Sequence, residues 1–275
     1  MSDPLSLPKN KAYLANLIRR KKSFLCVGLD PDLEKIPRSY LDGNEPFCTF
    51  CSDVVQSTAD FAIAYKINIA FFEALGPEGW VQLEKIVSEI PKDLLLIADA
   101  KRADIGNTSM KYADYYFDRL KADAITLHPY MGMDSLLPFL ERRDKWSVIL
   151  ALTSNPGAVD FELKILEGGQ PLYEEVINKF FRSEYSDQLM FVVGATKSEN
   201  MSHVRSISPD SFFLVPGVGE QGGSLEDTIR LGRNQDEGLI INVGRSIMYP
   251  KGIHTTMDDV RQAARNFQEQ MAKWF

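Results

Sequence analysis

The sequence lacks the long apolar runs that a membrane helix or a secretory signal needs. No segment reaches the roughly 18 consecutive apolar residues of a membrane span. The first residues, MSDPLSLPKNK, contain no apolar run of the signal-peptide kind. We therefore expect a cytoplasmic protein that does not enter a membrane.

An excess of positive charge is also lacking. Lysine and arginine number 31 against 38 acidic residues, which gives a formal charge of −7. No basic stripe marks a surface for a nucleic-acid backbone, so we expect no nucleic-acid partner. An anionic substrate would need a local site built from individual lysine and arginine side chains, because the whole chain repels it.

Cysteine is scarce, with Cys26, Cys48 and Cys51 in the whole chain. Three thiols cannot all pair within one chain, and a protein of this size needs no disulfide framework. Cys48 and Cys51 form a CxxC, but no second CxxC or histidine pair follows at zinc-site spacing. We favour burial of these cysteines over a metal or redox role and expect no metal.

Linkers are missing as well. The 275 residues, 44% hydrophobic and 25% charged, have the composition of a globular protein. No segment rich in proline, glycine and serine divides the chain, and no repeat of solenoid period is visible. We expect a single domain over residues 1–275.

What the chain does have is an alternation of short apolar runs and longer segments of helical period. The runs are too short and too β-branched for amphipathic helices, so we predict strands there. The predicted strands are Phe24–Leu29, Phe61–Ile67, Leu94–Ala98, Ala124–Leu127, Val148–Leu152, Leu189–Val193, Ser211–Val215 and Leu239–Val243. The predicted helices between and after them include Pro77–Ile90, Asn107–Leu120, Leu172–Arg182, Ser224–Leu231 and Thr256–Lys273.

This alternation predicts an α/β fold in which parallel strands are joined by helices. Continuous apolar strands imply burial on both faces, and repeated βα units favour a closed (β/α)8 barrel, the TIM barrel. An open dinucleotide-binding sheet is the alternative. It would need a G-x-G-x-x-G turn after an early strand, whereas the first predicted strand runs into LDPDL.

Polar residues follow the predicted strands, at the end of a barrel where active sites lie. Two loops late in the chain are also rich in glycine, a pattern typical of phosphate binding through backbone N–H groups. The strand-end residues are Asp30, Lys66, Asp99, Lys101, Asp104, His128, Thr153 and Ser154. The loop residues are Gly217, Gly219, Gln221, Gly222, Gly223, Gly244 and Arg245, and a purely structural turn with a solvated Arg245 is the alternative.

The segment D-A-K-R-A-D after the third predicted strand concentrates charge. Side chains alternate along a strand, so Asp99 and Lys101 would point to the same face, with Lys66 on the neighbouring strand. Burying several opposed charges is costly unless function maintains the arrangement. An ion-paired architecture without catalysis is the alternative.

These residues carry a resemblance to a known family. DAKRADIGNT (99–108) is similar to the signature of orotidine 5′-monophosphate decarboxylases, in the form found in the family's longer branch. Four further segments agree in order along nearly the whole chain. They are YKIN with Lys66, LTSNPG with Ser154, PGVGEQGG with Gln221 and VGRSI with Arg245.

The resemblance implies a barrel that converts orotidine 5′-monophosphate to uridine 5′-monophosphate and carbon dioxide without metal or cofactor, the last step of pyrimidine biosynthesis. It also implies a homodimer, with Asp104 reaching the partner's site. The implied catalytic residues are Lys66, Asp99, Lys101 and Asp104, and the implied substrate-binding residues are Asp30, Thr108, Ser154, Gln221, Gly244 and Arg245. We leave His128 out of the mechanism, because a lone histidine there can be structural.

Two other functions stay open. One is a magnesium-dependent keto-sugar-phosphate decarboxylase or synthase of the same superfamily, which would need an acidic residue where Lys66 stands. The other is a barrel that binds a nucleotide phosphate without catalysis.

Overall fold

Eight strands follow one another around a closed barrel in chain order. The computed structural model describes residues 8–195, 198–219 and 222–275. The strands are β1 (Leu25–Leu29), β2 (Ala64–Asn68), β3 (Leu95–Arg102), β4 (Ala124–Leu127), β5 (Trp146–Leu152), β6 (Leu189–Val193), β7 (Phe212–Val215) and β8 (Leu239–Val243). Neighbouring strands from β1 to β3 and from β4 to β8 pair in parallel register. The predicted (β/α)8 barrel is confirmed.

Helices connect the strands. The α-helices are α1 (Lys11–Lys21), α2 (Pro46–Thr58), α3 (Ile69–Glu73), α4 (Pro77–Glu89), α5 (Gly106–Ala113), α6 (Met133–Leu140), α7 (Leu172–Phe181), α8 (Ser198–Ile207), α9 (Leu225–Gly232), α10 (Arg245–Met248) and α11 (Met257–Ala272). Shorter elements are η1 (Arg38–Tyr40), η3 (Pro156–Asp160), η4 (Ser186–Gln188) and η6 (Gly252–His254), with a π-helical turn η2 (Asp114–Arg119).

The predicted elements differ from the observed ones mainly at their ends. Phe61 does not open β2, because its N–H donates to Thr58 O and so continues the turn that ends α2. The helix predicted over Asn107–Leu120 is α5 followed by η2. β3 continues through the charged residues as far as Arg102, four residues beyond the predicted strand, which ended at Ala98 where the apolar run stops.

The strands are apolar because both of their faces are covered. Every residue of β1, β4, β6 and β7 is buried. Burial on both faces removes the in-and-out alternation of a half-exposed strand. Polar residues inside such strands therefore stand out, and Thr126 on β4 is one of them, with 1% of its surface exposed.

The contacts within the chain group it into two compact units. Among the described residues, the first unit comprises Leu17–Ala100 and Asn242–Phe275, and the second comprises Pro8–Asn16 and Lys101–Ile241. The three borders fall inside α1, β3 and β8.

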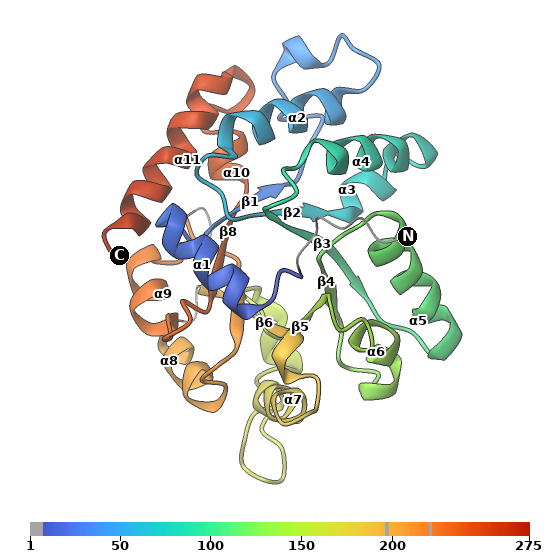
Figure 1. Cartoon of the computed structure of the whole chain (residues 1–275), viewed down its shortest axis with the longest axis vertical. Coiled ribbons are helices and arrows are strands. Elements are labelled where there is room, and N and C mark those ends of the chain that lie inside the picture. Colours follow the sequence, from blue (N-terminus) through green and yellow to red (C-terminus); the bar gives the residue numbers. More distant parts are fainter. Residues whose placement is uncertain (1–7, 196–197, 220–221) are drawn as a thin grey trace. The chain divides into compact units, whose positions relative to one another are not determined.

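In the first unit, α2 lies beside α4 and also contacts α11 (Figure 1). Tyr249 stacks on Phe50 of α2, with ring centroids 5.5 Å apart. The loop after β8 is thereby packed against α2. Within the first unit this packing helps to hold the segments that follow β1 and β8.

In the second unit, α5 lies beside α6, and α8 beside α9 (Figure 1). The guanidinium of Arg205 on α8 lies over the ring of Phe213 on β7, 3.8 Å from its centroid. It also donates hydrogen bonds to backbone carbonyls that include Gly232 O and Gly238 O. One arginine thus ties α8 to the segments before β7 and β8.

Candidate active site

Lys66 is the centre of a buried charged group in the first unit. It stands on β2 and is 5% exposed. Its Nζ donates a hydrogen bond to Asp99 Oδ2 on β3 at 2.9 Å and lies 3.7 Å from Asp30 Oδ1, just after β1. Residue 68 of β2 pairs with residue 99 of β3, which places the ends of these strands side by side. The structure therefore brings together three of the predicted site residues.

The charge on Lys66 is stabilised by these neighbours. Burial alone would lower the pKa of its ammonium, but the attraction of Asp30 and Asp99, with the hydrogen bond to Asp99, outweighs burial and raises the pKa above the ordinary value. Lys66 is therefore a fixed positive charge. A group of this kind can orient neighbouring carboxylates and bind hydroxyls, and it keeps its charge at neutral pH.

Asp30 is held in place through its backbone. Its N–H donates to Met248 Sδ at 3.2 Å, and Tyr249 Oη donates to its carbonyl at 3.4 Å. The same hydroxyl accepts a hydrogen bond from Asp32 N at 3.0 Å. Asp30 Oδ1 is buried and has no hydrogen-bond partner among the described residues, although the ammonium of Lys66 is near. This oxygen can accept a hydrogen bond from a ligand hydroxyl.

Gly244 and Arg245 follow β8 in the same unit. A Cβ on Gly244 would lie 3.3 Å from Asp30 Oδ2, and one on Gly28 would lie 3.1 Å from Gly244 Cα. Two glycines thus let the ends of β1 and β8 approach closely. Arg245 is exposed and is the first residue of α10, where its guanidinium can meet an anion from solution.

Lys101 lies at the end of β3, in the second unit. Its φ is +48°, in the left-handed region that a non-glycine residue rarely adopts. The alternation that predicts Asp99 and Lys101 on one face assumes extended backbone, and the backbone at Lys101 is not extended. Its N–H instead donates to Thr126 Oγ1 on β4 at 2.9 Å, and its side chain is exposed.

Asp104 follows in the loop between β3 and α5. Its Oδ1 accepts a hydrogen bond from Ile105 N at 2.7 Å. Ser109 closes the loop, since its hydroxyl accepts from Asp104 N at 3.0 Å and lies 2.7 Å from both Asp104 O and Ser135 O. Thr108, in the first turn of α5, is exposed.

Ser154 lies after β5 and is half-buried. The backbone of Gly194, after β6, passes so close that a Cβ there would lie 2.8 Å from both Ser154 N and Ser154 Cβ. Glu162 accepts hydrogen bonds from the N–H and the hydroxyl of Thr153, each at 2.7 Å. The loop that carries Ser154 is thus fixed on two sides. Gln221 lies outside the described residues.

His128 stands after β4 with its N–H donating to Arg102 O at 3.2 Å. Burial lowers the pKa of its imidazole, the charge of Lys101 lowers it further, and Glu162 opposes both effects. His128 is thus neutral at neutral pH.

None of the cysteines forms a disulfide. Cys26 and Cys51 are buried, and burial raises the pKa of Cys26 to about 12 and that of Cys51 well above its ordinary value. Burial also raises the pKa of Cys48. The CxxC of α2 therefore carries protonated thiols, as the expected structural role requires.

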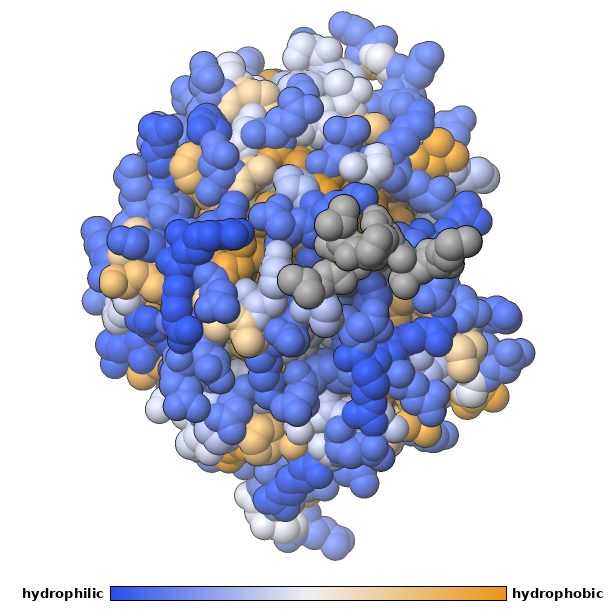
Figure 2. All heavy atoms as spheres, viewed as in Figure 1, coloured by the Kyte–Doolittle hydropathy of each residue, from blue (hydrophilic) through white to orange (hydrophobic). Residues whose placement is uncertain are grey.

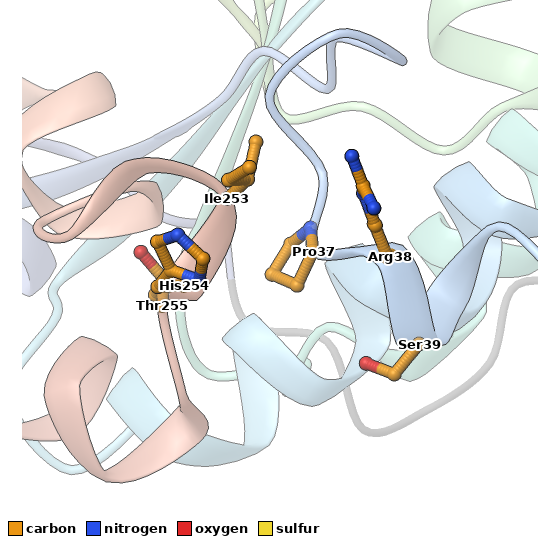
Figure 3. Close-up of a pocket in the computed structure, with 6 residues that line it drawn as sticks. All are labelled: Pro37, Arg38, Ser39, Ile253, His254 and Thr255. Atoms are coloured by element: carbon orange, nitrogen blue, oxygen red, sulfur yellow. The ribbon is translucent and has the colours of Figure 1, made fainter.

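A pocket of about 510 Å³ opens in the first unit between η1 and η6. It is lined by Pro37, Arg38, Ser39, Ile253, His254 and Thr255. In Figure 3 the side chains of Arg38 and His254 lie on opposite sides of Pro37, so their nitrogens do not converge on one point. None of the predicted site residues lines this pocket.

Sequence reasoning missed the residues that fix the backbone around the predicted site residues. Thr126 bonds the backbone of Lys101, Tyr249 holds the Asp30 segment, Ser109 closes the Asp104 loop and Gly194 packs on Ser154. Each lies inside or near an apolar run or a helix. The only signal for Thr126 was a hydroxyl in the middle of AITL, where a strand residue facing the interior would be apolar.

Comparison with known proteins identifies the family to which the chain belongs. The family described as "Orotidine 5'-phosphate decarboxylase / HUMPS family" matches residues 23–257. The chain belongs to this family. The predicted family is thereby confirmed.

Relatives of this family match along most of their length. An orotidine 5'-phosphate decarboxylase of Bacteroides fragilis is 47% identical over 267 residues, which is 96% of this chain and 97% of the relative. One from Flavobacterium johnsoniae is 46% identical over 93% of this chain and 94% of its own.

Solved structures agree with the barrel. An OMP decarboxylase from Leishmania donovani superposes with a TM-score of 0.82 at 35% identity, covering 96% of this chain and 98% of that one. A UMP synthase of the same organism gives 0.83 at 38% identity over 94% of this chain, which spans 55% of that longer chain.

The described residues contain neither a candidate metal cluster nor a candidate membrane span. No cluster of three or more histidine, cysteine, aspartate or glutamate side chains there could hold a metal ion. No helix in that part of the chain is long and apolar enough to cross a membrane.

Proposed function

We propose that this chain decarboxylates orotidine 5′-monophosphate to uridine 5′-monophosphate, without metal or cofactor, as the last step of pyrimidine biosynthesis. The observation that carries the proposal is the buried Asp30–Lys66–Asp99 group at the strand ends of a chain that belongs to the decarboxylase family. The strand that carries Asp99 goes on to Lys101, and its loop carries Asp104.

The chemistry demands a cation beside the reacting carbon. When the C6–carboxylate bond breaks, carbon dioxide leaves and the electron pair stays on C6, where no adjacent group delocalises it. An ammonium placed there stabilises this charge in the transition state. Lys101 Nζ then gives a proton to C6 to form the product, and the neutral amine regains a proton from solvent.

Lys66 does not serve as the proton donor in this proposal. Its two carboxylate neighbours raise the pKa of the ammonium, which suits a fixed charge rather than an acid. Asp99 would face the departing carboxylate, while Lys66 and Asp104 hold Lys101 in place. Asp30 would bind the ribose hydroxyls together with Lys66, consistent with its buried Oδ1.

The remaining binding roles follow the family motifs. Ser154 would hydrogen-bond the pyrimidine, and Gln221, Gly244 and Arg245 would hold the phosphate. The exposed guanidinium of Arg245, at the first residue of α10, suits a phosphate that arrives from solution. Binding energy from the distant phosphate can also support the reaction at the ring.

We also propose that the chain forms one domain over residues 1–275 and works as a homodimer in the cytoplasm, with Asp104 and Thr108 contributing across the interface. Ile105, next to Asp104, is 65% exposed in the single chain, and Tyr130 is 85% exposed. Exposed apolar side chains of this size suit a subunit contact. Figure 2 shows a mostly hydrophilic face with small scattered apolar groups, so not every face suits such a contact.

An ultraviolet assay tests the activity. Purified protein should lower the absorbance of orotidine 5′-monophosphate as it becomes uridine 5′-monophosphate, and Lys101→Ala should abolish turnover while leaving the fold intact. Treatment with a chelator should leave the rate unchanged. Loss of activity on chelation would favour the magnesium enzyme, and binding without turnover would favour a non-catalytic barrel.

A further inference from the structure

Lys101 has an unusual backbone for the residue that the proposed reaction depends on most. Its φ of +48° places it in the left-handed region, although it stands in a strand and carries a long side chain. For a residue other than glycine this conformation is strained, and it persists only where the surroundings hold it. Strain of this kind gathers at functional sites.

One visible restraint on that backbone is a side chain. The N–H of Lys101 donates to Thr126 Oγ1 at 2.9 Å, so a hydroxyl on β4 bonds the backbone of β3 at this point. Thr126 is 1% exposed and is flanked on β4 by Ile125 and Leu127, both fully buried. A hydroxyl at such a position is costly to bury unless it makes hydrogen bonds.

The next backbone contact is of the ordinary kind. His128 N donates to Arg102 O at 3.2 Å. Thr126 accepts its hydrogen bond from Lys101, the residue directly before Arg102. Lys101 is the residue at which the backbone of β3 departs from extended geometry. The strain of one left-handed lysine and the net strength of one hydrogen bond are of the same order, so losing the bond can release the conformation.

We propose that Thr126 is a positioning residue that holds the Lys101 backbone in its left-handed conformation and so aims the ammonium at the reacting carbon. This inference rests on the proposed decarboxylation. Thr126 needs no contact with the substrate for this role. Its hydroxyl acts only through the backbone of Lys101, which predicts an effect on turnover rather than on substrate binding.

The test compares Thr126→Val with Thr126→Ser in the full-length protein. Valine keeps the shape and removes the acceptor, whereas serine keeps the acceptor. We expect valine to lower kcat about 100-fold, the scale of a misplacement of about 1 Å, with KM changed by less than about threefold. Serine should restore kcat to within about threefold of the unaltered protein.

A matched control separates positioning from lost stability. Thr58 on α2 is also fully buried, and its hydroxyl donates to Val54 O at 2.7 Å. Thr58→Val should lower the melting temperature at least as much as Thr126→Val while leaving kcat unchanged. Should Thr126→Val not fold, Thr126→Cys replaces it with the same expected result, because a thiol is a weak acceptor.

Several results would overturn the inference. A kcat within threefold of the unaltered protein in Thr126→Val, or in Thr126→Cys where that variant replaces it, would do so, and so would a serine variant as slow as valine. A loss of kcat in Thr58→Val that scales with its melting temperature would reduce Thr126 to a structural residue. If the unaltered protein binds but does not decarboxylate orotidine 5′-monophosphate, the proposed function fails first and this inference with it.

Discussion

The ammonium of Lys66 donates a hydrogen bond of 2.9 Å to Asp99 Oδ2. Asp30 Oδ1 lies 3.7 Å from the same ammonium. One buried positive charge is thus shared by two carboxylates. Removing it leaves two negative charges that repel each other in a site that is largely shielded from water.

Lys66→Met should therefore lower the free energy of unfolding by about 3–5 kcal/mol at neutral pH, the range for breaking a buried ion pair. Urea unfolding followed by circular dichroism measures it. Lys35→Met is the matched control, because Lys35 and Asp32 form a more exposed pair and should cost at most about 1 kcal/mol. Equal losses in the two variants would contradict the buried group.

The pH dependence of this group has a definite sign. The pKa of Lys66 in the folded protein is raised above the ordinary value of 10.5. The contribution of Lys66 to stability is therefore complete below pH 10.5. It is lost only as the pH rises through the pKa of the folded state. The difference in unfolding free energy between the unaltered protein and Lys66→Met should stay constant from about pH 7 to about pH 9. A difference that shrinks across this window would mean that Lys66 loses its proton there.

His128 reports on the charge of Lys101. Burial is the main cause of its lowered pKa, and Lys101 adds repulsion. Lys101→Met should therefore raise the pKa of His128, although burial still keeps it below 6.5. Nuclear magnetic resonance of the imidazole protons measures the titration, with His128→Asn identifying the signal. An unchanged titration in Lys101→Met would place the ammonium away from His128.

The same lowered pKa has a consequence for stability. The native state resists protonation of His128, so the unfolded state binds this proton more readily as the pH falls through 6.5. Stability should fall over that window in the unaltered protein and fall less in His128→Asn. Urea midpoints at about pH 7.5 and about pH 5.5 give the comparison.

Gly194 fixes the place of Ser154. An alanine Cβ would lie 2.8 Å from Ser154 N, closer than real Cβ contacts, and the atom in the way is backbone. Gly194→Ala should therefore displace Ser154 and raise KM for orotidine 5′-monophosphate, by about tenfold if one hydrogen bond to the pyrimidine is lost. Steady-state kinetics measure the change.

Gly43→Ala is the control for this substitution. A Cβ on Gly43 meets only Tyr40 O, at an ordinary distance of 3.8 Å. Its KM should match that of the unaltered protein. A normal KM in Gly194→Ala would mean that the loop of Ser154 gives way without cost or that Ser154 does not touch the pyrimidine.

Sequence reasoning succeeded for features that depend on the composition of a strand or on the residue at its end. The apolar runs located the eight strands because burial on both faces leaves no other composition. Asp30, Lys66 and Asp99 were predicted together because parallel strands end at the same side of a barrel. The structure places these three within one buried group.

It failed where backbone conformation decides. The sequence predicts extended backbone at Lys101, whereas φ at this residue is +48°. That Asp99 and Lys101 share one face stays a prediction. Nothing in the letters DAKRAD marks a left-handed lysine, because the restraint comes from Thr126, 25 residues later. The close approach of Gly194 to Ser154 was invisible for the same reason, since it depends on the register between β5 and β6.

The proposed sharing of Asp104 between subunits can be tested by mixing two inactive variants. If Asp104 serves the partner's site, a dimer of one Lys101→Ala chain and one Asp104→Asn chain carries both defects in one site and none in the other. Random exchange makes half of the dimers mixed, so about a quarter of the sites regain full activity.

Mixing Lys101→Ala with Lys66→Met is the control, because both defects lie in a chain's own site and every mixed site keeps one of them. Activity near a quarter in the first mixture and none in the second is the expected outcome. If the first mixture stays inactive although exchange is verified by mass, Asp104 acts within its own chain.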